Sequence, residues 1–124
     1  MLLRIVSISK KFIPKFGGNS ELPDAQKVVI HFAHIPGRGE RSNYISYSFD
    51  AKGSVDIRYN NVGLVALVDR VENFEIEDEN GIKKRITTGA ELAALNHSSL
   101  DELFAEMREH LFPDDDLTVG ELKA

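Results

Sequence analysis

The sequence predicts a small α+β protein, and three observations indicate this class. Short stretches in which apolar and polar residues alternate fill much of the N-terminal half of the chain. An Asn80-Gly81 pair between two short runs of mixed polarity is typical of a β-hairpin. Capping residues followed by apolar positions at helical spacing occupy the C-terminal half. We therefore expect a small antiparallel sheet in the N-terminal half, followed by a hairpin and helices.

Branched and aromatic residues predict the N-terminal strands. Residues 2–8 fit a strand or an extended arm, and residues 27–35 are rich in Val, Ile and Phe and fit a strand. Residues 44–49 and 54–59 alternate on either side of a turn, although residues 40–44 equally fit one helical turn. Residues 44–49 and 54–59, with the turn between them, together favour a small antiparallel meander.

A helix is expected near residues 61–71. Asn60 and Asn61 are good N-caps, since a short polar side chain can accept a hydrogen bond from an unpaired backbone amide. Apolar residues at 64, 65, 68 and 71 then recur at helical spacing. The hairpin is expected near residues 74–86, with acidic residues on one arm facing basic residues on the other.

Two further helices are expected, near residues 89–95 and 100–112. Thr88 and Glu91 have capping-box spacing, in which each side chain satisfies a backbone amide near the other residue. The second helix carries an apolar face and is ended by Pro113. That face is formed by Leu100, Leu103, Phe104, Met107 and Leu111.

Composition bounds the class of protein. The chain has 124 residues, of which 42% are hydrophobic and 28% charged, which fits one domain spanning residues 1–124. It has no apolar run of the roughly 20 residues that a membrane-spanning helix needs, and no recognisable signal peptide, so we expect a cytoplasmic protein. The absence of cysteine excludes disulfides, zinc-thiolate sites and thiol nucleophiles.

The charge is unevenly distributed along the chain. The formal net charge is -5, which argues against a general nucleic-acid binder. Residues 1–19 carry four bases and no acid, whereas residues 101–124 carry eight acids and two bases. We expect residues 1–26 to form an extended basic arm and residues 113–124 a loosely packed tail. This polarity either steers association with a partner or another copy, or simply reflects two solvated ends.

Motifs for chemistry are not evident. His31 and His34 lie three apart on a predicted strand and so point to opposite faces, which does not suit a shared metal ion. His97 and His110 are interpreted as structural, 114–116 as a solvated helix start, and 37–39 as a surface turn. We therefore expect no catalytic residues, no cofactor and no metal, and we expect that the chain is not an enzyme.

Two stretches support a family resemblance. Residues 12–23 (FIPKFGGNSELP), which lead into a Val-rich strand, resemble the opening of small tailed-phage proteins. Residues 68–91 contain Val71-Glu72-Asn73-Phe74 and later Thr88-Gly89-Ala90-Glu91. In this order, with the Leu100–Leu111 helix and Leu117–Glu121 following, they resemble the core and tail of siphophage (prophage) tail assembly chaperones.

The resemblance implies a non-catalytic assembly factor. Such a chaperone binds the tail-tube protein, the tape-measure protein or both transiently, prevents their premature polymerisation and is absent from the finished tail. The family often also makes a longer, frameshifted form. The alternatives are a structural tail-completion or connector subunit that forms a ring, a homo-oligomer in which the charged ends meet, or a small enzyme or nucleic-acid regulator.

A transient binder needs an exposed apolar surface. Two helical faces are candidates: the face formed by Leu103, Phe104, Met107 and Leu111, and the helix expected over 62–71. The alternative is that both faces belong to the core, because a chain this short needs most of its apolar residues inside.

Overall fold

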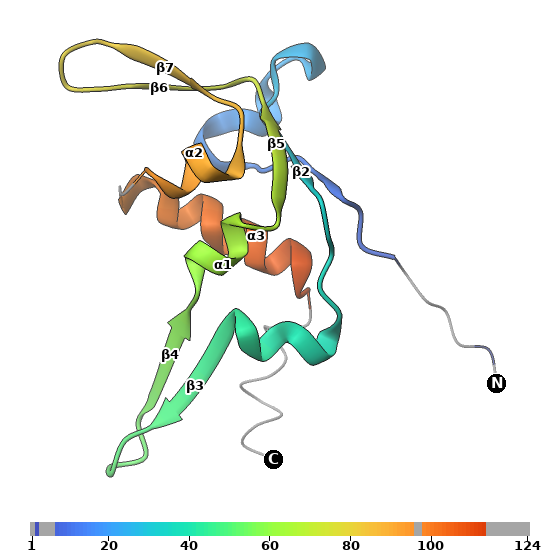
Figure 1. Cartoon of the computed structure of the whole chain (residues 1–124), viewed down its shortest axis with the longest axis vertical. Coiled ribbons are helices and arrows are strands. Elements are labelled where there is room, and N and C mark those ends of the chain that lie inside the picture. The colour runs from blue at the N-terminus through green and yellow to red at the C-terminus, as the bar shows by residue number, and fades with distance from the viewer. Residues whose placement is uncertain (1, 3–6, 96–97, 114–124) are drawn as a thin grey trace.

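The computed structural model describes residue 2, residues 7–95 and residues 98–113. It has an α+β fold, with strands mostly in the N-terminal two thirds and helices toward the C-terminus, as predicted (Figure 1). The strands are β1 (Lys11–Phe12), β2 (Val29–Phe32), β3 (Ile45–Phe49), β4 (Val55–Tyr59), β5 (Val68–Glu72), β6 (Phe74–Glu77) and β7 (Lys83–Ile86). The α-helices are α1 (Asn61–Val65), α2 (Gly89–Ala93) and α3 (Asp101–Leu111). Short 3-10 helices cover Phe16–Glu21, Asp24–Gln26, Arg38–Asn43 and Ser98–Leu100.

The described strands form three separate antiparallel sheets. One has three strands in the order β1-β2-β5, and the other two are the hairpins β3–β4 and β6–β7. The antiparallel pairing expected of residues 44–49 and 54–59 is confirmed, since β3 and β4 pair with each other, and they form a sheet separate from β2. The helical turn and the strand that the sequence offered as alternatives for residues 40–49 are both present. A 3-10 helix ends at Asn43, and β3 begins at Ile45.

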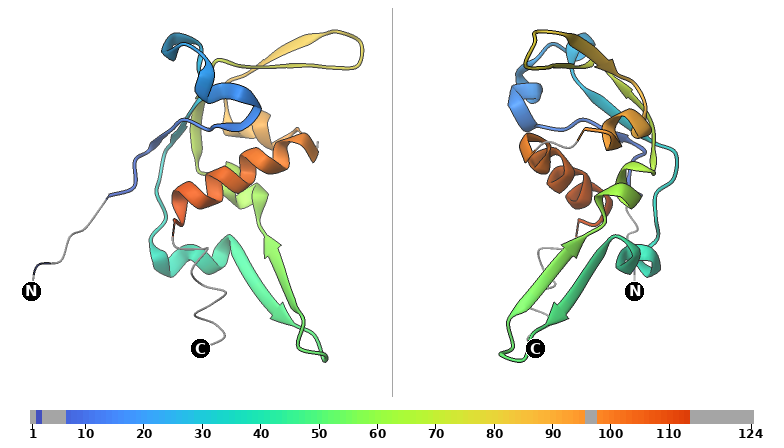
Figure 2. Two further views of the ribbon diagram at one scale, coloured as in Figure 1. Left: turned by 180° about the vertical axis from the view of Figure 1, so that it is seen from behind. Right: turned by 60° about the vertical axis from the view of Figure 1, so that its left-hand side comes forward.

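The core lies between the three-stranded sheet and the helices, with α3 crossing the molecule beside α1 and α2 (Figure 2). Ile30 and Val71, paired across β2 and β5, contribute from the sheet. Each fully buried side chain of this size contributes about 1.5–3 kcal/mol of hydrophobic free energy. The largest such side chains include Ile30, Leu64, Ile86, Leu92, Leu103, Met107 and Leu111.

The helix expected over 61–71 is only partly present. Asn60 caps α1 by accepting a hydrogen bond from the Gly63 amide, but α1 ends at Val65 and residues 68–72 form β5. The register of β5 against β2 skips Asp69, so that Val68 lies opposite Phe32 and Val71 opposite Ile30. Because of this bulge, Val68 and Val71 both face the core although they are three residues apart. In a strand with strict alternation they would face opposite sides. A helical spacing of apolar residues therefore arose from a bulged strand.

The two C-terminal helices are confirmed. Thr88 caps α2, its hydroxyl accepting a hydrogen bond from the Glu91 amide at 3.1 Å. Gly89 is needed at the next position because a Cβ there would collide with the Val65 carbonyl oxygen and lie 3.0 Å from that of Val68. Helix α3 spans most of the expected 100–112 segment, and the chain leaves the helix at Phe112, before Pro113.

The extended basic arm expected over residues 1–26 needs correction for residues 10–26, which pack against the body. The buried Asn19 side chain donates to the carbonyls of Pro14 (2.7 Å) and Val28 (3.1 Å) and accepts from the Val28 amide (2.7 Å). The Glu106 carboxylate on α3 accepts from the amides of Lys15 and Phe16. Positions 1 and 3–6, and the tail from position 114 onward, lie outside the described residues.

The hairpins β3–β4 and β6–β7 extend from opposite ends of the molecule (Figures 1 and 2). The expected hairpin over 74–86 is confirmed, with Glu75 facing Arg85 and Glu77 facing Lys83. Both hairpins use the same five-residue turn, Asp-x-x-Gly-x. In each turn the aspartate carboxylate accepts two backbone amides, and the glycine has a positive φ, at Gly53 and Gly81.

Candidate protein-binding surface

The helical face predicted for partner binding is inside the core. All four of its residues are buried, so they are core residues in this structure, which was the alternative interpretation of this face. The second predicted surface is also mostly buried, because α1 directs Leu64 and Val65 inward and leaves Val62 exposed. The four α3 residues are Leu103, Phe104, Met107 and Leu111.

The histidines have separate partners. His31 contacts Glu72 at 3.0 Å, and His34 contacts Glu40 at 3.5 Å. The Nε2 atom of His110 donates to the Ser9 carbonyl at 2.7 Å, and its ring stacks on Phe12. Among the described residues, no group of three or more His, Asp and Glu side chains is placed to hold a metal ion. His97 and residues 114–116 lie outside that part of the chain.

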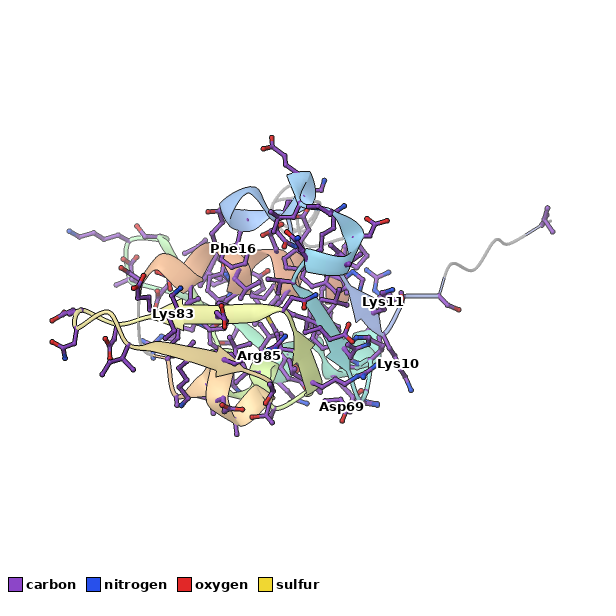
Figure 3. The ribbon with its side chains drawn as sticks, turned by 90° about the horizontal axis from the view of Figure 1, so that it is seen from above. Lys10, Lys11, Phe16, Asp69, Lys83 and Arg85 are labelled. Atoms are coloured by element: carbon purple, nitrogen blue, oxygen red, sulfur yellow. The ribbon has the colours of Figure 1, made fainter. Side chains whose placement is uncertain are left out.

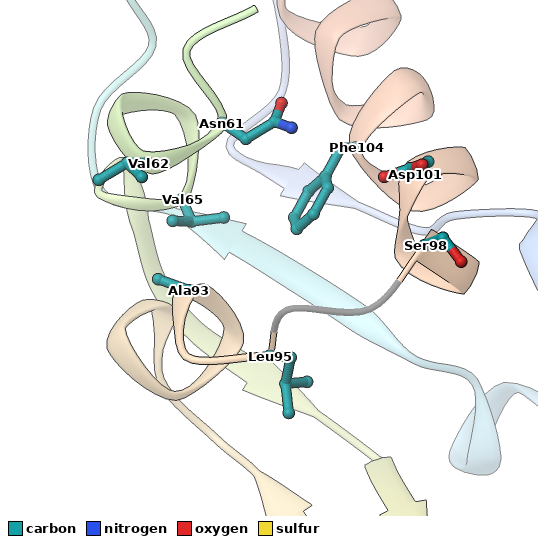
Figure 4. A pocket seen from close by; sticks show the side chains of 8 residues that line it. All are labelled: Asn61, Val62, Val65, Ala93, Leu95, Ser98, Asp101 and Phe104. Atoms are coloured by element: carbon teal, nitrogen blue, oxygen red, sulfur yellow. The ribbon is translucent and has the colours of Figure 1, made fainter.

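A pocket of about 600 Å³ opens between α1, α2 and the start of α3 (Figure 4). Apolar side chains from all three helices line it, together with Asn61, Ser98 and Asp101. Of the described residues that line it, Asp101 alone carries a titratable side chain. No described helix is long and apolar enough to cross a membrane.

The most distinctive surface is one face of the β3–β4 hairpin. Residues that pair directly across an antiparallel ladder project from the same side of it. The register pairs Ile45 with Tyr59, Tyr47 with Ile57, and Phe49 with Val55. All six of these side chains therefore share one face, which we call the hairpin face. Ser46, Ser48, Asp56 and Arg58 occupy the opposite side.

Along β3 the cover of the hairpin face decreases from foot to tip, whereas all three β4 residues of the face are exposed. Ile45 is buried and Tyr47 is half-buried, but Phe49 is 65% exposed, Val55 47%, Ile57 38% and Tyr59 49%. A two-stranded hairpin is at best marginally stable in water, and contiguous exposed apolar residues mark protein-binding sites. Covering the exposed apolar side chains of the hairpin face would therefore stabilise the hairpin.

Two arginines border the hairpin face, one at Tyr47 in the middle of β3 and one at Tyr59 at the foot of β4. The Arg41 guanidinium lies 5.4 Å from the centre of the Tyr47 ring and donates to its hydroxyl at 2.6 Å. The Arg108 guanidinium, from α3, lies 3.7 Å from the centre of the Tyr59 ring and donates to Asn61 at 2.9 Å. The apolar face therefore has a positively charged border.

The β6–β7 hairpin has charged pairs where the β3–β4 hairpin has exposed apolar residues. One side of β6–β7 carries two acid-base pairs, and the other carries Phe74 and Ile86, which are buried at its foot. Seen from above, Lys83 and Arg85 extend along this charged hairpin, while Lys10, Lys11 and Asp69 lie around the three-stranded sheet (Figure 3). Charged pairs keep such a hairpin soluble, which explains why it can project without cover.

Sequence reasoning identified the β3 and β4 strands but not their shared face as a site. A signal was present, because alternation in 44–49 and 54–59 becomes one apolar face once the Asp50 turn fixes the register. The sequence could not show that this face is exposed, because its exposure depends on how distant parts of the chain pack.

Comparison with models of known protein families finds no match. Comparisons with curated proteins and with solved structures find no match either.

Proposed function

We propose that the chain is a non-catalytic binding protein that holds a partner chain on the hairpin face, and that it acts as a tail assembly chaperone of a phage or prophage. The single observation that carries the binding role is the contiguous exposure of Phe49, Val55, Ile57 and Tyr59 on one side of a projecting hairpin. The sequence resemblance supplies the class of partner: a tail-tube or tape-measure protein.

The size of the hairpin face suits a transient complex. Its exposed part is limited to a few side chains, whereas standard stable interfaces use about 20–30 residues on each side. Among the described strands, β3 and β4 pair only with each other, so neither has a further strand at its outer edge in that part of the chain. A partner segment can therefore add backbone hydrogen bonds to an edge while its apolar side chains contact the face.

Co-expression and pull-down test this function. The chain is produced together with the tail-tube or tape-measure protein encoded beside it, and the purified complex is examined. Retention of that partner, with release on dilution, is the expected result. Absence of tail genes beside this gene, or failure to retain either protein, would overturn the chaperone role.

A structural ring subunit is the second candidate, since the same exposed face and free strand edges can pair with another copy. Native mass spectrometry of the purified chain distinguishes the two. A monomer or dimer is expected of the chaperone, and a stable closed ring would establish the structural role instead.

A further inference from the structure

We propose that β4 is a self-pairing edge strand, through which two copies of this chain form an antiparallel dimer with a two-fold axis at Ile57. The two hairpins then make one four-stranded sheet in the order β3-β4-β4-β3. This pairing concerns the chain alone and does not depend on the proposed function.

The backbone of β4 directs hydrogen-bonding groups to the outer edge of the hairpin. The Asp50 amide donates to the Ser54 carbonyl at 3.0 Å, and the Asn60 amide donates to the Tyr44 carbonyl at 2.8 Å. In an antiparallel ladder, such bonded pairs alternate with pairs whose backbone groups point outward. The β4 residues with outward-pointing amides and carbonyls are therefore Val55, Ile57 and Tyr59.

The β4 edge is more open than the β3 edge. All five β4 residues are exposed, whereas in β3 Ile45 is buried and Tyr47 is half-buried beneath the Arg41 guanidinium. Figure 1 shows β4 along the margin of the molecule. Among the described strands β4 pairs only with β3, so its outward-pointing groups have no ladder partner in that part of the chain.

Charge complementarity identifies a second copy as the occupant of this edge. When two β4 strands pair antiparallel about an axis at Ile57, Asp56 of each copy lies directly opposite Arg58 of the other. Both side chains are exposed, Asp56 by 57% and Arg58 by 78%, and they contact each other within the strand at 3.0 Å. Pairing of two copies adds two further contacts between opposite charges.

The same register suits the backbone and the apolar side chains. It sets Ile57 against Ile57 and Val55 against Tyr59 in both directions, and these are the residues whose backbone groups point outward. Three such pairs exchange about six hydrogen bonds. A slip of two residues would set Asp56 against Asp56 or Arg58 against Arg58, so like charges oppose the nearest alternative registers.

The other hairpin strands lack this self-complementarity. Strand β7 carries Lys83, Lys84 and Arg85 in succession, so two β7 strands would set base against base. The polar side of β3 has only Ser46 and Ser48 and provides no charge pair. The proposed pairing is therefore specific to β4.

Two-fold pairing gives a closed and reversible dimer. Each copy uses its β4 edge once, so the assembly stops at two copies. Only one short strand from each copy forms the junction, which is small compared with the roughly 800 Å² that each partner contributes to a stable interface. The two hairpin faces become one continuous apolar surface, and both β3 edges remain outermost. That this larger surface holds the partner chain rests on the proposed function.

Disulfide formation in single-cysteine variants tests the register, because the natural chain contains no cysteine. In Ile57→Cys the two Cα atoms at the axis would lie about 5.5 Å apart, which suits a disulfide, and oxidised glutathione should convert this variant into a covalent dimer.

Phe49→Cys is the matched control. Position 49 is more exposed than position 57 (65% against 38%), so random collisions would link it more readily. In the proposed dimer, however, the two β3 strands lie roughly 14 Å apart, too far for a disulfide. We expect Phe49→Cys to link about tenfold or more slowly than Ile57→Cys. Equal or faster linking of Phe49→Cys would overturn the proposal.

Charge reversal tests the complementarity, with dimer dissociation constants measured by sedimentation equilibrium. Arg58→Asp and Asp56→Arg each set like charges opposite one another at both contacts and should weaken the dimer about tenfold or more. An equimolar mixture of the two variants restores opposite charges at both contacts, so its dimer should be as strong as that of the unmodified chain. This recovery would also show that both variants are folded.

Three results would overturn the proposal: an unmodified chain that stays monomeric at every concentration, a closed assembly larger than a dimer, or a mixture that associates no better than the separate variants. None of these measurements uses a partner protein. Failure of the dimer and failure of the chaperone role are therefore distinguished.

Discussion

The guanidinium of Arg108 lies 3.7 Å from the centre of the Tyr59 ring, and this contact joins α3 to the last residue of β4. The same guanidinium donates to Asn61 at the start of α1. Helix, hairpin and the connection between hairpin and α1 thus meet at one side chain. The orientation of the hairpin face relative to the body depends on this junction.

A double-mutant cycle measures the coupling between Arg108 and Tyr59. Arg108→Ala and Tyr59→Leu are each compared with the double variant by urea denaturation. A cation over an aromatic ring at such a site is worth about 0.5–2 kcal/mol, and we expect a coupling of that size. A coupling indistinguishable from zero would mean that the two residues are merely adjacent.

Gly89→Ala should destabilise the protein by about 1–3 kcal/mol, because the added Cβ collides with the Val65 carbonyl and forces α1, α2 and β5 apart. Gly39→Ala is the matched control, since a Cβ at position 39 meets no atom within 4 Å and that backbone has no positive φ. Chemical denaturation of both variants provides the comparison. Equal losses would contradict the close approach at Gly89.

Glu106→Gln should destabilise the protein by about 1–3 kcal/mol, because the carboxylate accepts from two backbone amides and the new amide group turns a donor toward one of them. The exposed Glu109→Gln on the same helix removes an equal charge and is the control. Faster hydrogen exchange around Phe16 in the first variant alone is the local signature. Similar behaviour of the two variants would show that the loop holds without Glu106.

The pKa of Glu91 lies below its ordinary value of 4.5, chiefly because the Thr87 hydroxyl donates to the carboxylate. A carboxyl whose pKa is lowered by folding contributes stability above its unfolded pKa. That contribution disappears as the pH falls from about 4.5 through the folded value. Thr87→Val should therefore raise the pKa of Glu91 toward 4.5 and weaken the pH dependence of unfolding in that range. A carboxyl titration by NMR in both proteins checks this, and an unchanged Glu91 would refute it.

Local chemistry explains which elements could be predicted from the sequence. The cap at Thr88, the turn at Asp78–Ile82 and the apolar spacing of α3 each depend on residues close together in the chain. The prediction of one helix over 61–71 was wrong for its second half, because the bulged strand there forms by pairing with β2, which lies far away in the sequence. A helical spacing and a bulged strand place valines in the same pattern.

The exposure of the hairpin face could not be predicted for a related reason. Leu103 on α3 and Phe49 on β3 are both apolar, and both lie on a regular apolar face of their own element. Packing decides between them, since α3 crosses the centre of the molecule and the tip of β3–β4 projects beyond it (Figure 2). Only the tertiary arrangement shows which apolar face lacks a neighbour.

Partner affinity of two matched variants tests the central claim, that the hairpin face is the binding surface. Phe49→Ser removes the most exposed side chain of the face, and Ile82→Ser removes a similarly exposed residue (65% and 62%) from the other hairpin. Binding of each variant to the tail-tube or tape-measure protein is measured by titration. We predict that Phe49→Ser weakens binding about tenfold or more, as expected for an aromatic anchor, and that Ile82→Ser leaves it unchanged. Equal affinity of the two variants would contradict the account.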